Sequence, residues 1–351
     1  MFHSLRVTKI VQETPDARSV VLEIPHSLTR DFAYRAGQFV TVEVPHEGGH
    51  LRRCYSLASS PDCGEGHKFT VKRVHGGPVS TYMNEGLREG DVLQVMRPEG
   101  RFVLDDGMAP LLLFAGGSGI TPVISILKTV LRTTARRATL LYANRDARSI
   151  IFARELEQLR HQHGDRVNVI HHLDEARGYL GEAAVRSLVD AHPGATAFLC
   201  GPGPFMALVE RVLLAAGWPE GRVRIERFEH AAGKATTPAV AAAPVAAGAN
   251  GAAPGVTEGV PASIEVHLRG QKHLVPYTPG KTLLQTARDA GIDAPYSCEE
   301  GFCGCCASHL LEGRVVMAAD DALSSEEKKK GMILACQSKP TTTRCAFRFV
   351  D

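Results

Sequence analysis

Apolar and polar residues alternate in short runs over the first third of the chain. Residues 19–24, 38–44 and 69–74 show this two-residue alternation, and Pro and Gly residues separate the runs. Alternation with a period of two gives a β-strand one apolar and one polar face. We therefore expect residues 1–106 to form antiparallel β-structure, either a barrel or a sandwich.

The pattern changes near Pro110, where apolar runs begin to alternate with stretches of helical periodicity. These runs lie at residues 111–115, 138–143, 167–171 and 196–200. Strands that are apolar throughout and separated by helices are typical of a parallel, doubly wound sheet, because helices cover both of its faces. The pattern predicts an α/β nucleotide-binding domain over residues 107–229.

Ala, Pro and Gly dominate the next segment. They make up 22 of the 32 positions in residues 231–262, which also contain four prolines, two charged residues and no aromatic residue. Such a composition cannot supply a hydrophobic core, and the prolines interrupt any long alanine helix. We interpret residues 230–262 as a semi-flexible linker with an r.m.s. span of roughly 30 Å.

A short module follows the linker, over residues 263–351. Residues 264–268 and 273–277 have the pattern of a β-hairpin, and residues 281–291 have the spacing of an amphipathic helix. A cysteine-rich loop and further short apolar runs complete the module. We expect an α+β fold here.

Composition narrows the range of functions. The chain has 351 residues, of which 44% are hydrophobic and 22% charged, and its formal net charge is +2. A net charge this small does not create the positive electrostatic potential that binds a polyanion. We therefore expect no nucleic-acid partner. The N-terminus has no apolar signal region, and no run of about 18 apolar residues occurs, so we expect a cytoplasmic protein with no membrane partner.

Five of the nine cysteines lie in one stretch near the C-terminus. In a chain without a secretion signal, this clustering indicates a metal centre rather than disulfides. Cys298, Cys303 and Cys306 have the plant-type C-x4-C-x2-C spacing, and Cys336 follows 30 positions later. One tight loop and one distant segment thus supply the four thiolates that a 2Fe-2S cluster needs. The two glycines of the loop would let backbone amides turn toward the sulfurs.

Two other cysteines compete for these ligand positions. Cys305 in place of Cys306 would break the two-residue spacing. Cys345 lies in an expected final strand, so we prefer Cys336 as the fourth ligand. A zinc site would more usually show paired ligands at short spacing, and structural thiols do not recur four times in nine residues. We interpret five cysteines as ordinary small side chains: Cys54, Cys63, Cys200, Cys305 and Cys345. Two of these also lie inside the motifs described next.

The segment Arg53-Cys54-Tyr55-Ser56 begins one of the expected barrel strands. An arginine beside a strand can neutralise a flavin pyrophosphate, a tyrosine can stack on the flavin ring, and a serine can reach a ring nitrogen. Lys72 and the segment 77–80 follow about twenty residues later. A core tyrosine beside a surface arginine explains these residues equally well.

Two glycine-rich segments follow strands of the expected parallel sheet. GGSGITP, residues 116–122, lies between the first strand and a helix, where glycines let phosphates approach and the helix N-terminus supplies amide donors. CGPGPFM, residues 200–206, follows the fourth strand, at the sheet edge where ligands bind. Either segment could instead be a turn that needs no ligand.

In this order, the motifs resemble the ferredoxin-NADP reductase superfamily, and within it the class that carries a C-terminal plant-type ferredoxin. YRAGQF, residues 34–39, is similar to the family's Y-x-P-G-Q-F, with Ala36 in place of the proline. RCYSL, GGSGITP and CGPGPFM match the flavin and nucleotide motifs, and CEEGFCGCC with LACQ matches the cluster motif. The resemblance covers nearly the whole chain. It implies an FAD-binding β-barrel, an α/β nucleotide-binding domain and a β-grasp ferredoxin domain.

The resemblance also implies roles for individual residues. Those implied to hold FAD are Arg53, Cys54, Tyr55, Ser56, Lys72, Gly77, Val79, Ser80 and Thr121. Those implied to hold the nicotinamide nucleotide are Gly116, Gly117, Ser118, Gly119, Pro122, Cys200, Gly201, Pro202, Phe205 and Met206. Phe228 is the candidate for an aromatic ring beside the flavin, and a strand-end core residue is the alternative. No catalytic side chain is expected, because the cofactors relay the electrons.

Within this class the sequence is most similar to the reductase components of 3-ketosteroid 9α-hydroxylases, at DARS, LRRCYSLASSP, VKRV and LYANRDARSIIF. The resemblance implies a monomeric reductase that passes electrons from NAD(P)H through FAD and the 2Fe-2S cluster to a separate Rieske oxygenase. The alternatives are a reductase subunit of a phenylacetyl-CoA epoxidase or another ring-hydroxylating oxygenase and, from another class, a flavin/iron-sulfur redox sensor. No Rieske-type Cys-x-His pair occurs in the chain, so we expect the oxygen chemistry elsewhere.

The choice between NADH and NADPH stays open in the sequence. Arg145, after the second strand of the expected parallel sheet, could meet a 2′-phosphate together with Ser149. Asp146 beside it would repel one. The resemblance favours NADH, which we expect as the electron donor, with NADPH as the alternative.

Overall fold

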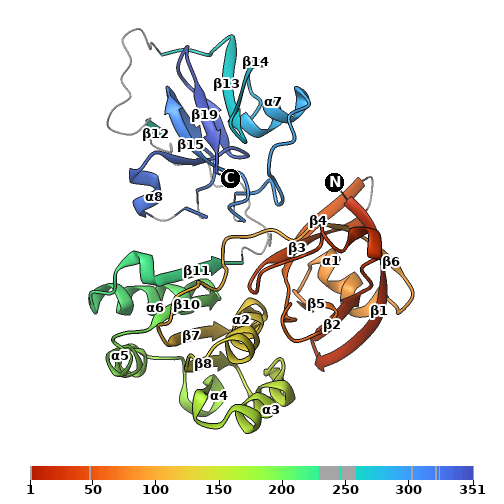
Figure 1. The fold of residues 1–351 in the computed structure, drawn as a ribbon, viewed down its shortest axis with the longest axis vertical. Coiled ribbons are helices and arrows are strands. Elements are labelled where there is room, and N and C mark those ends of the chain that lie inside the picture. The colour runs from red at the N-terminus through yellow and green to blue at the C-terminus, as the bar shows by residue number, and fades with distance from the viewer. Residues whose placement is uncertain are drawn as a thin grey trace. The chain divides into compact units, whose positions relative to one another are not determined.

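The computed structural model describes residues 2–46, 49–228, 245–246, 258–301, 303–320, 322–323 and 325–350. The chain divides into two compact units, Met1–Ala232 and Gly233–Asp351, whose helices and strands are labelled in Figure 1. Most of the predicted linker, residues 230–262, lies outside the described residues.

Within the described part of the chain, six strands form the N-terminal sheet, in the order β4-β3-β6-β1-β2-β5. They are β1 (Phe2–Thr14), β2 (Ala17–Leu22), β3 (Phe39–His46), β4 (Gly49–Ser56), β5 (His67–Lys72) and β6 (Val92–Met96). Every neighbouring pair is antiparallel. An antiparallel bridge joins Leu57, directly after β4, to Phe69 of β5, so the sheet closes into a barrel, one of the two forms that the alternation allowed and the one that the resemblance implied.

The alternating apolar residues of the barrel strands fill its interior. Leu5, Val40 and Leu93, from three different strands, belong to one buried cluster. The short helix α1 (Pro78–Thr81) and the π-helical turn η2 (Tyr82–Gly86) add Val79 and Met83 to the same cluster. Because β1, β2, β3 and β6 each bury apolar side chains on one face, the pairing register of these strands is firmly specified.

The second part of this unit is a parallel sheet in the order β11-β10-β7-β8-β9. Its strands are β7 (Leu111–Gly116), β8 (Ala138–Asn144), β9 (Val167–Leu173), β10 (Thr196–Gly201) and β11 (Val223–Arg227). Its helices are α2 (Ile120–Thr133), α3 (Ala153–His163), α4 (Asp174–Arg177), α5 (Glu182–Ala191) and α6 (Gly203–Ala215). The predicted parallel α/β architecture is therefore confirmed.

Burial on both faces explains why these strands are apolar throughout. Leu111 and Leu113 pack in one core cluster with residues of α2 and α3. Leu112 and Phe114, which point the other way, pack in a second cluster with residues of α5 and α6. The two clusters leave the carboxyl ends of the strands as the edge open to a ligand.

In the C-terminal unit, the described strands form one mixed sheet in the order β14-β13-β19-β15-β17 and a smaller sheet in the order β12-β16-β18. The strands are β12 (Val245–Ala246), β13 (Ser263–Leu268), β14 (Gln271–Pro276), β15 (Ala307–Glu312), β16 (Arg314–Met317), β17 (Met332–Leu334), β18 (Ser338–Pro340) and β19 (Ala346–Phe349). The helices are α7 (Leu283–Asp289) and α8 (Ser325–Lys329). The expected hairpin and α+β class are confirmed.

Two predicted element boundaries were wrong in this unit. Helix α7 is shorter than residues 281–291, because Thr282 and Gln285 form a capping box that starts it at Leu283. Cys345 lies just before β19 rather than inside a final strand. Its carbonyl still accepts a hydrogen bond from the Glu265 amide, at 2.9 Å.

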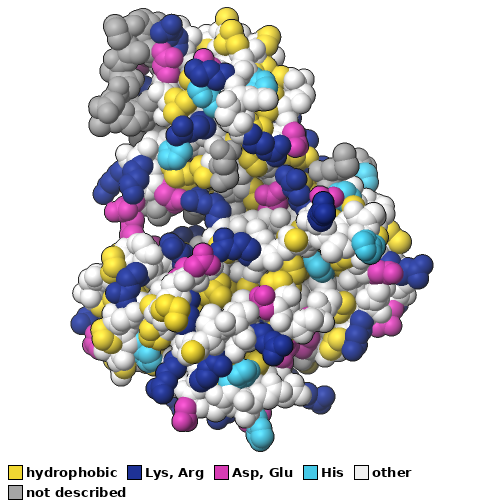
Figure 2. Space-filling view, viewed as in Figure 1, with side chains coloured by type: hydrophobic (Ala, Val, Ile, Leu, Met, Phe, Trp, Pro, Cys, Tyr) yellow, Lys and Arg dark blue, Asp and Glu magenta, His cyan; other side chains and the backbone are white. Residues whose placement is uncertain are grey.

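No helix in the described residues is long and apolar enough to cross a bilayer. On the face shown in Figure 2, basic and acidic side chains are interspersed rather than gathered into a patch of one sign. This distribution agrees with the small net charge of +2. It gives no stripe of positive potential on that face for a polyanion.

Gly37, in the turn before β3, provides a test of the barrel's packing. Its φ is +98°, and a Cβ there would collide with the carbonyl oxygen of Phe102. Gly90 has a similar φ of +94° but open space around it. Gly37→Ala should destabilise the protein by about 2 to 4 kcal/mol, from left-handed strain and overpacking together. Gly90→Ala should show only the strain, about 1 to 2 kcal/mol.

Calorimetric or denaturant unfolding of the two variants measures this difference. Equal losses for Gly37→Ala and Gly90→Ala would show that the turn relaxes away from Phe102.

Candidate functional site

Glycines at the carboxyl edge of the parallel sheet bring two chain segments into direct contact. A Cβ on Gly119 would collide with the main chain of Cys200, and a Cβ on Gly116 would lie 2.7 Å from the Pro202 ring. A Cβ on Gly201 would lie 3.0 Å from the Gly116 amide nitrogen. The segments after β7 and β10 can therefore pack only because these positions lack side chains.

This packing gives a different reason for the glycine at position 119 from the one that the sequence suggested. The glycines of residues 116–119 were expected to let a phosphate approach the backbone. The close approach at Gly119 is instead made by Cys200 of the same chain. A larger residue at Gly119 would thus disturb the junction of β10 and α2 before it affected any nucleotide.

Other contacts fix the 116–122 segment at the start of α2. The Tyr142 hydroxyl donates to the Gly117 carbonyl at 3.0 Å, and the Thr121 hydroxyl donates to the Ser118 carbonyl at 3.1 Å. Gly117 has a left-handed φ of +52°, and its missing Cβ would lie 3.9 Å from the Lys72 ammonium. Gly117 and Ser118 remain partly exposed, whereas Pro122 is buried in the first turn of α2. A partly exposed turn, a helix N-terminus and a nearby ammonium suit an anion.

The segment 200–206 is a shorter loop than the sequence suggested. Cys200 and Gly201 end β10, and Gly203 already begins α6, so that Pro202 alone connects them. Met206 is buried in the core under α6, which makes it a packing residue in this structure. Burial raises the pKa of the Cys200 thiol well above its ordinary value, so the thiol stays protonated.

Glu226 is a candidate site residue that the sequence analysis missed. It lies in β11 directly opposite Cys200 on β10. Its Oε2 atom is buried without a hydrogen-bond partner among the described residues. Burial raises the pKa of Glu226 to about 8, so the side chain is largely a neutral acid at pH 7. Phe228 follows the strand, half-buried against the core cluster on the α2 side.

The predicted flavin residues 53–56 end strand β4, whereas the sequence had suggested that they begin a strand. The Tyr55 ring stacks on Phe69, with ring centroids 5.4 Å apart and planes at 18°, and burial raises the pKa of Tyr55. Arg53 is partly exposed on the same strand, and its charge acts on Tyr55. The Cys54 thiol lies 3.4 Å from the hydroxyl of Thr41 on β3, so it faces a protein partner.

Ser56 ends β4 with a buried hydroxyl. Its Oγ atom has no hydrogen-bond partner among the described residues. An unpaired buried hydroxyl costs about 1 to 3 kcal/mol, so such groups usually serve a ligand or ordered water. This atom is the structural observation that best fits a bound flavin at β4.

The other predicted flavin contacts lie in the turn between β5 and α1. The Ser80 hydroxyl accepts from the Val74 amide and donates to the Gly77 carbonyl, each at 3.0 Å. Val79 is buried in the barrel core. These two side chains therefore hold the turn itself and do not face outward. Lys72, at the end of β5, lies 3.8 Å from Asp16.

The two residues suggested for a 2′-phosphate are both engaged by carboxylates. Arg145 is exposed and lies 3.5 Å from Asp16. Ser149 shares a capping box with Asp146, in which its hydroxyl and amide both pair with that residue. Neither side chain is held ready for an added phosphate.

The four predicted cluster cysteines converge in two pairs. The thiols of Cys298 and Cys303 contact each other, and so do those of Cys306 and Cys336. The Cys336 amide donates to the Cys306 sulfur at 3.4 Å, and the charge of Cys303 acts on Cys306. The described residues contain no group of three or more such ligands around a single ion. A two-iron cluster needs two thiolates per iron instead, which two adjacent pairs provide.

The loop backbone turns its amides toward these sulfurs. Glu299 and Gly301 have left-handed φ values of +56° and +89°. The Glu300 amide donates to the Cys298 sulfur at 3.4 Å, and the Gly301 amide bonds Cys336. Gln337 anchors the remote segment through its side-chain amide, 2.8 Å from the Glu299 carbonyl. Such amide donors stabilise thiolate ligands.

The competing cysteines have different surroundings. Cys345 is buried in the apolar core, where burial raises its pKa to about 12. Cys305 lies in the turn before β15 and is partly exposed. Within the described residues, Cys345 packs among apolar side chains, which agrees with its interpretation as a packing residue.

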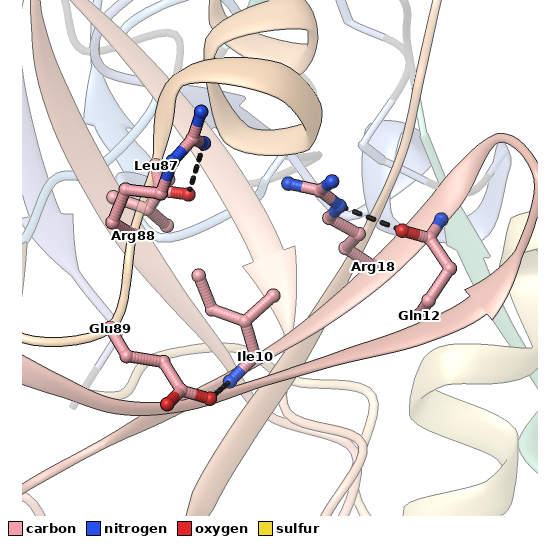
Figure 3. A pocket seen from close by; sticks show the side chains of 6 residues that line it. All are labelled: Ile10, Gln12, Arg18, Leu87, Arg88 and Glu89. Carbon is pink, nitrogen blue, oxygen red and sulfur yellow. Dashed lines mark hydrogen bonds between the residues drawn. The ribbon is translucent and has the colours of Figure 1, made fainter.

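A hollow of about 360 Å³ on the barrel surface lies apart from all these residues. Figure 3 shows the six residues that line it, from β1, β2 and the segment after η2. Arg18 donates to the Gln12 side chain at 2.8 Å, and the Glu89 carboxylate accepts from the Ile10 amide at 2.8 Å. Its polar groups pair with one another and include no predicted site residue.

Family models match three consecutive parts of the chain. An oxidoreductase FAD-binding domain matches residues 4–104, an oxidoreductase NAD-binding domain matches residues 113–211, and a 2Fe-2S iron-sulfur cluster binding domain matches residues 266–341. FAD, NAD(H) and a 2Fe-2S cluster are therefore the cofactors of this chain. The orphaned Ser56 hydroxyl, the turn at Gly117 and the paired thiols fit them.

Curated relatives extend this similarity to the full length. The chain is 40% identical to the ferredoxin reductase component of 3-ketosteroid-9-alpha-monooxygenase from Rhodococcus rhodochrous, over 98% of this chain and 96% of that protein. It is 31% identical to one of the subunits of 1,2-phenylacetyl-CoA epoxidase from Escherichia coli strain K12, over 97% and 96%. Among solved structures, phthalate dioxygenase reductase matches with a TM-score of 0.61 and 26% identity, over 99% and 98% of the two chains.

Replacing the paired thiols tests the cluster site. Cys298→Ser, Cys303→Ser, Cys306→Ser or Cys336→Ser should each abolish a stable cluster, because one iron loses half of its protein ligands. Cys305→Ser and Cys345→Ser are the matched controls and should retain it. Iron content and visible absorbance after anaerobic reconstitution measure the outcome. Equal iron loss in the Cys305 and Cys306 variants would show that the ligand set is wrong.

The buried acid at Glu226 predicts a pH dependence of stability. Its folded pKa, about 8, is above its ordinary value, so its stabilising effect is complete at acid pH and is lost as pH rises through about 8. The free energy of unfolding should thus fall as the pH rises from the ordinary value of 4.5 to about 8, and level off above that. Glu226→Gln should flatten that slope in denaturant titrations. An unchanged slope in the variant would place the ionising group elsewhere.

Proposed function

The chain belongs to the family of oxygenase ferredoxin reductase components that join FAD-binding, NAD-binding and 2Fe-2S domains, and we propose that its partner is the Rieske oxygenase of a 3-ketosteroid 9α-hydroxylase. The family makes it an oxidoreductase that supplies electrons to a separate terminal oxygenase. The observation that carries the choice of partner is the 40% identity over almost the full length of both chains. A steroid ring system is accordingly the substrate class proposed for the complete system.

The order of the cofactors follows from electron counting. A bound FAD would supply the conversion between two-electron hydride transfer from the nicotinamide and one-electron transfer to the 2Fe-2S cluster. The protein's own contribution is positioning, since no acid or base has to act on a substrate. The side chains described here bind and orient the cofactors and shield them from water.

We assign the flavin to β4 of the barrel and the nucleotide to the carboxyl edge of the parallel sheet. Arg53 neutralises the flavin pyrophosphate, Tyr55 packs beside the ring, and the unpaired Ser56 hydroxyl bonds a ring nitrogen. Lys72 and the turn at Gly117 meet where the two nucleotides would approach each other. Cys200 and the neutral acid Glu226 line the nicotinamide end of this site.

In the cluster site, each thiol pair would hold one iron. Cys298 and Cys303 would hold the first, and Cys306 and Cys336 would hold the second. The amides of Glu300 and Gly301 donate to the sulfurs, and such hydrogen bonds raise the reduction potential.

NADH is the proposed electron donor. The guanidinium of Arg145 is already beside Asp16, and Ser149 is bound by Asp146. An added 2′-phosphate would meet two carboxylates in this region, which disfavours NADPH.

The chain is proposed to work as a monomer of three domains, residues 1–106, 107–229 and 263–351, with residues 230–262 as the tether. The module after the tether has 11 acidic and 11 basic residues, so it lacks the charge that would steer a free ferredoxin. Tethering replaces that steering with an effective concentration in about the millimolar range. We place the protein in the reducing cytoplasm, because all nine cysteines are free thiols and four serve a cluster.

A second candidate partner is the oxygenase of a phenylacetyl-CoA epoxidase. The full-length match to a component of that enzyme favours it over other oxygenases, at 31% identity. The lower identity makes it the runner-up.

Reconstitution with purified oxygenase components distinguishes the candidates. NADH oxidation coupled to 9α-hydroxylation of a 3-ketosteroid is the expected result, with the epoxidase oxygenase as the comparison. Epoxide formed without steroid product would reverse the assignment. Cytochrome c reduction without product in either mixture would keep the reductase class and reject both partners. Absence of any NADH turnover would favour a redox sensor.

Replacing Arg53 tests the flavin assignment. Arg53→Ala should weaken FAD binding by about 1.5 to 3 kcal/mol, because it removes a charge-assisted bond to the pyrophosphate. This loss is about one to two decades in affinity. Arg52→Ala is the neighbouring control, since Arg52 bonds Glu43 and lies over the Phe2 ring. FAD retained on dilution is measured by fluorescence, and full retention in the Arg53 variant would reject the role.

A further inference from the structure

A row of buried polar side chains joins helix α2 to the barrel. The Ser125 hydroxyl donates to the Ser59 carbonyl at 2.6 Å, and the hydroxyls of Thr129 and Ser60 lie 2.6 Å apart. Positions 125, 128 and 129 share one face of a helix. That face of α2 therefore meets the chain segment that follows β4, as the adjacent placement of α2 and the barrel in Figure 1 also shows. We call this contact the seam.

Four charged groups continue the seam. Lys128 of α2 is only 3% exposed, and its ammonium lies 2.6 Å from Glu65 and 2.7 Å from Glu155. Lys68 on β5 lies 2.9 Å from the second oxygen of Glu155. Glu65 and Lys68 come from the barrel, and Lys128 and Glu155 come from the α/β part. Two ammonium groups thus alternate with two carboxylates, and the group is neutral as a whole.

Further contacts hold this network in place. Glu65 also accepts from the Ser60 amide at 3.2 Å. Lys68 lies 4.9 Å from the centre of the Phe152 ring, and Phe152 has a left-handed φ of 61° where α3 begins. Burial alone would raise the pKa of Glu155, but the ammonium groups of Lys128 and Lys68 outweigh it and hold that pKa below its ordinary value. The bridge is therefore ionic at neutral pH.

A network of charged groups withdrawn from water often adds little net stability to an interface. Desolvation of buried charges often cancels their mutual attraction, and apolar side chains of similar volume can be equally stabilising. What apolar contacts lack is direction. Ion pairs and hydroxyl bonds at fixed distances allow one relative orientation of the two surfaces, whereas apolar surfaces can slide.

The position of the seam connects it to the two cofactor edges. Its barrel side begins at Ser59, three residues after Ser56, the end of the proposed flavin strand. Its other side begins at Ser125, and the same helix starts at Ile120 directly after the proposed nucleotide turn. Because α2 is a continuous helix of 14 residues, a rotation at the seam would displace that turn relative to β4.

We propose that Lys128 is a positioning residue: bridging Glu65 and Glu155, it sets the orientation of the nucleotide-binding part against the barrel and thereby the approach of the nicotinamide to the flavin. The inference rests on the proposed roles of β4 and of residues 116–122, and it is independent of which oxygenase receives the electrons. The seam should therefore affect the rate of flavin reduction and not the affinity for either nucleotide.

Two variants of the holoenzyme separate positioning from simple stability. Lys128→Met leaves the partly buried Glu65 carboxylate without its ammonium partner and should lower both the melting temperature and the rate of flavin reduction. Lys128→Met combined with Glu65→Gln restores neutrality, because Lys68 still pairs with Glu155. The double variant should regain most of the melting temperature while flavin reduction at saturating NADH stays about tenfold or more below the original rate, as expected for misplaced reactants. Lys9→Met, at an exposed lysine of β1, is the matched control.

Anaerobic stopped-flow absorbance measures flavin reduction without any oxygenase. The KM for NADH and the FAD content should change little in the double variant. Hydrogen exchange gives a readout independent of turnover: amides of residues 59–65 should exchange faster, whereas those of β7 should keep their protection.

Each outcome decides the proposal. A double variant that recovers the rate together with the melting temperature would show a merely structural role and overturn it, as would an unchanged rate in Lys128→Met. Should Lys128→Met fail to fold, the double variant alone decides. If the original protein shows no flavin reduction by NADH, the proposed function itself fails, and that result is distinct from a failure of the seam.

Discussion

Backbone contact between the segments after β7 and β10 is the constraint on which the rest of the site depends. Gly119 touches the main chain of Cys200, and Gly116 faces Pro202. These strands are neighbours in the sheet, although β8 and β9 come between them in the chain. The order therefore reverses at β7, and a crevice at such a reversal point is where open parallel sheets bind ligands. Side chains at either glycine would hold the strand ends apart.

Two buried ionisable groups of the first unit show how partners decide charge. Glu226 has no partner for Oε2 among the described residues, so burial favours its neutral form. Lys128 is only 3% exposed, but its ammonium has two carboxylates within 2.7 Å. Removal from water opposes ionisation at both positions. Only Lys128 has opposite charges close enough to compensate for that cost. The unpaired acid lies at the ligand edge, whereas the paired lysine lies where two surfaces have to stay in register.

Local signals predicted the parts that local physics determines. The strands of both sheets were predictable because burial on one face gives alternation and burial on two faces gives apolar runs. The cysteine loop was predictable because ligand spacing is itself local. Glu226 was not, since an acid in a short strand has no motif and only the pairing of β11 with β10 brings it to Cys200. Lys128 was not either, because its partners are 63 and 27 residues away in the chain.

The fourth cysteine of the proposed cluster comes from a segment that follows β17. Cys336 lies 30 residues after Cys306, and strand β17 pairs with β15 between them. During synthesis the loop with the first three thiols therefore emerges 30 residues before the fourth thiol. Until then three thiols are open to oxidation or to a foreign ion such as zinc. The order of residues along the chain thus delays complete iron loading until Cys336 has emerged, when metal binding and folding of this unit become one event.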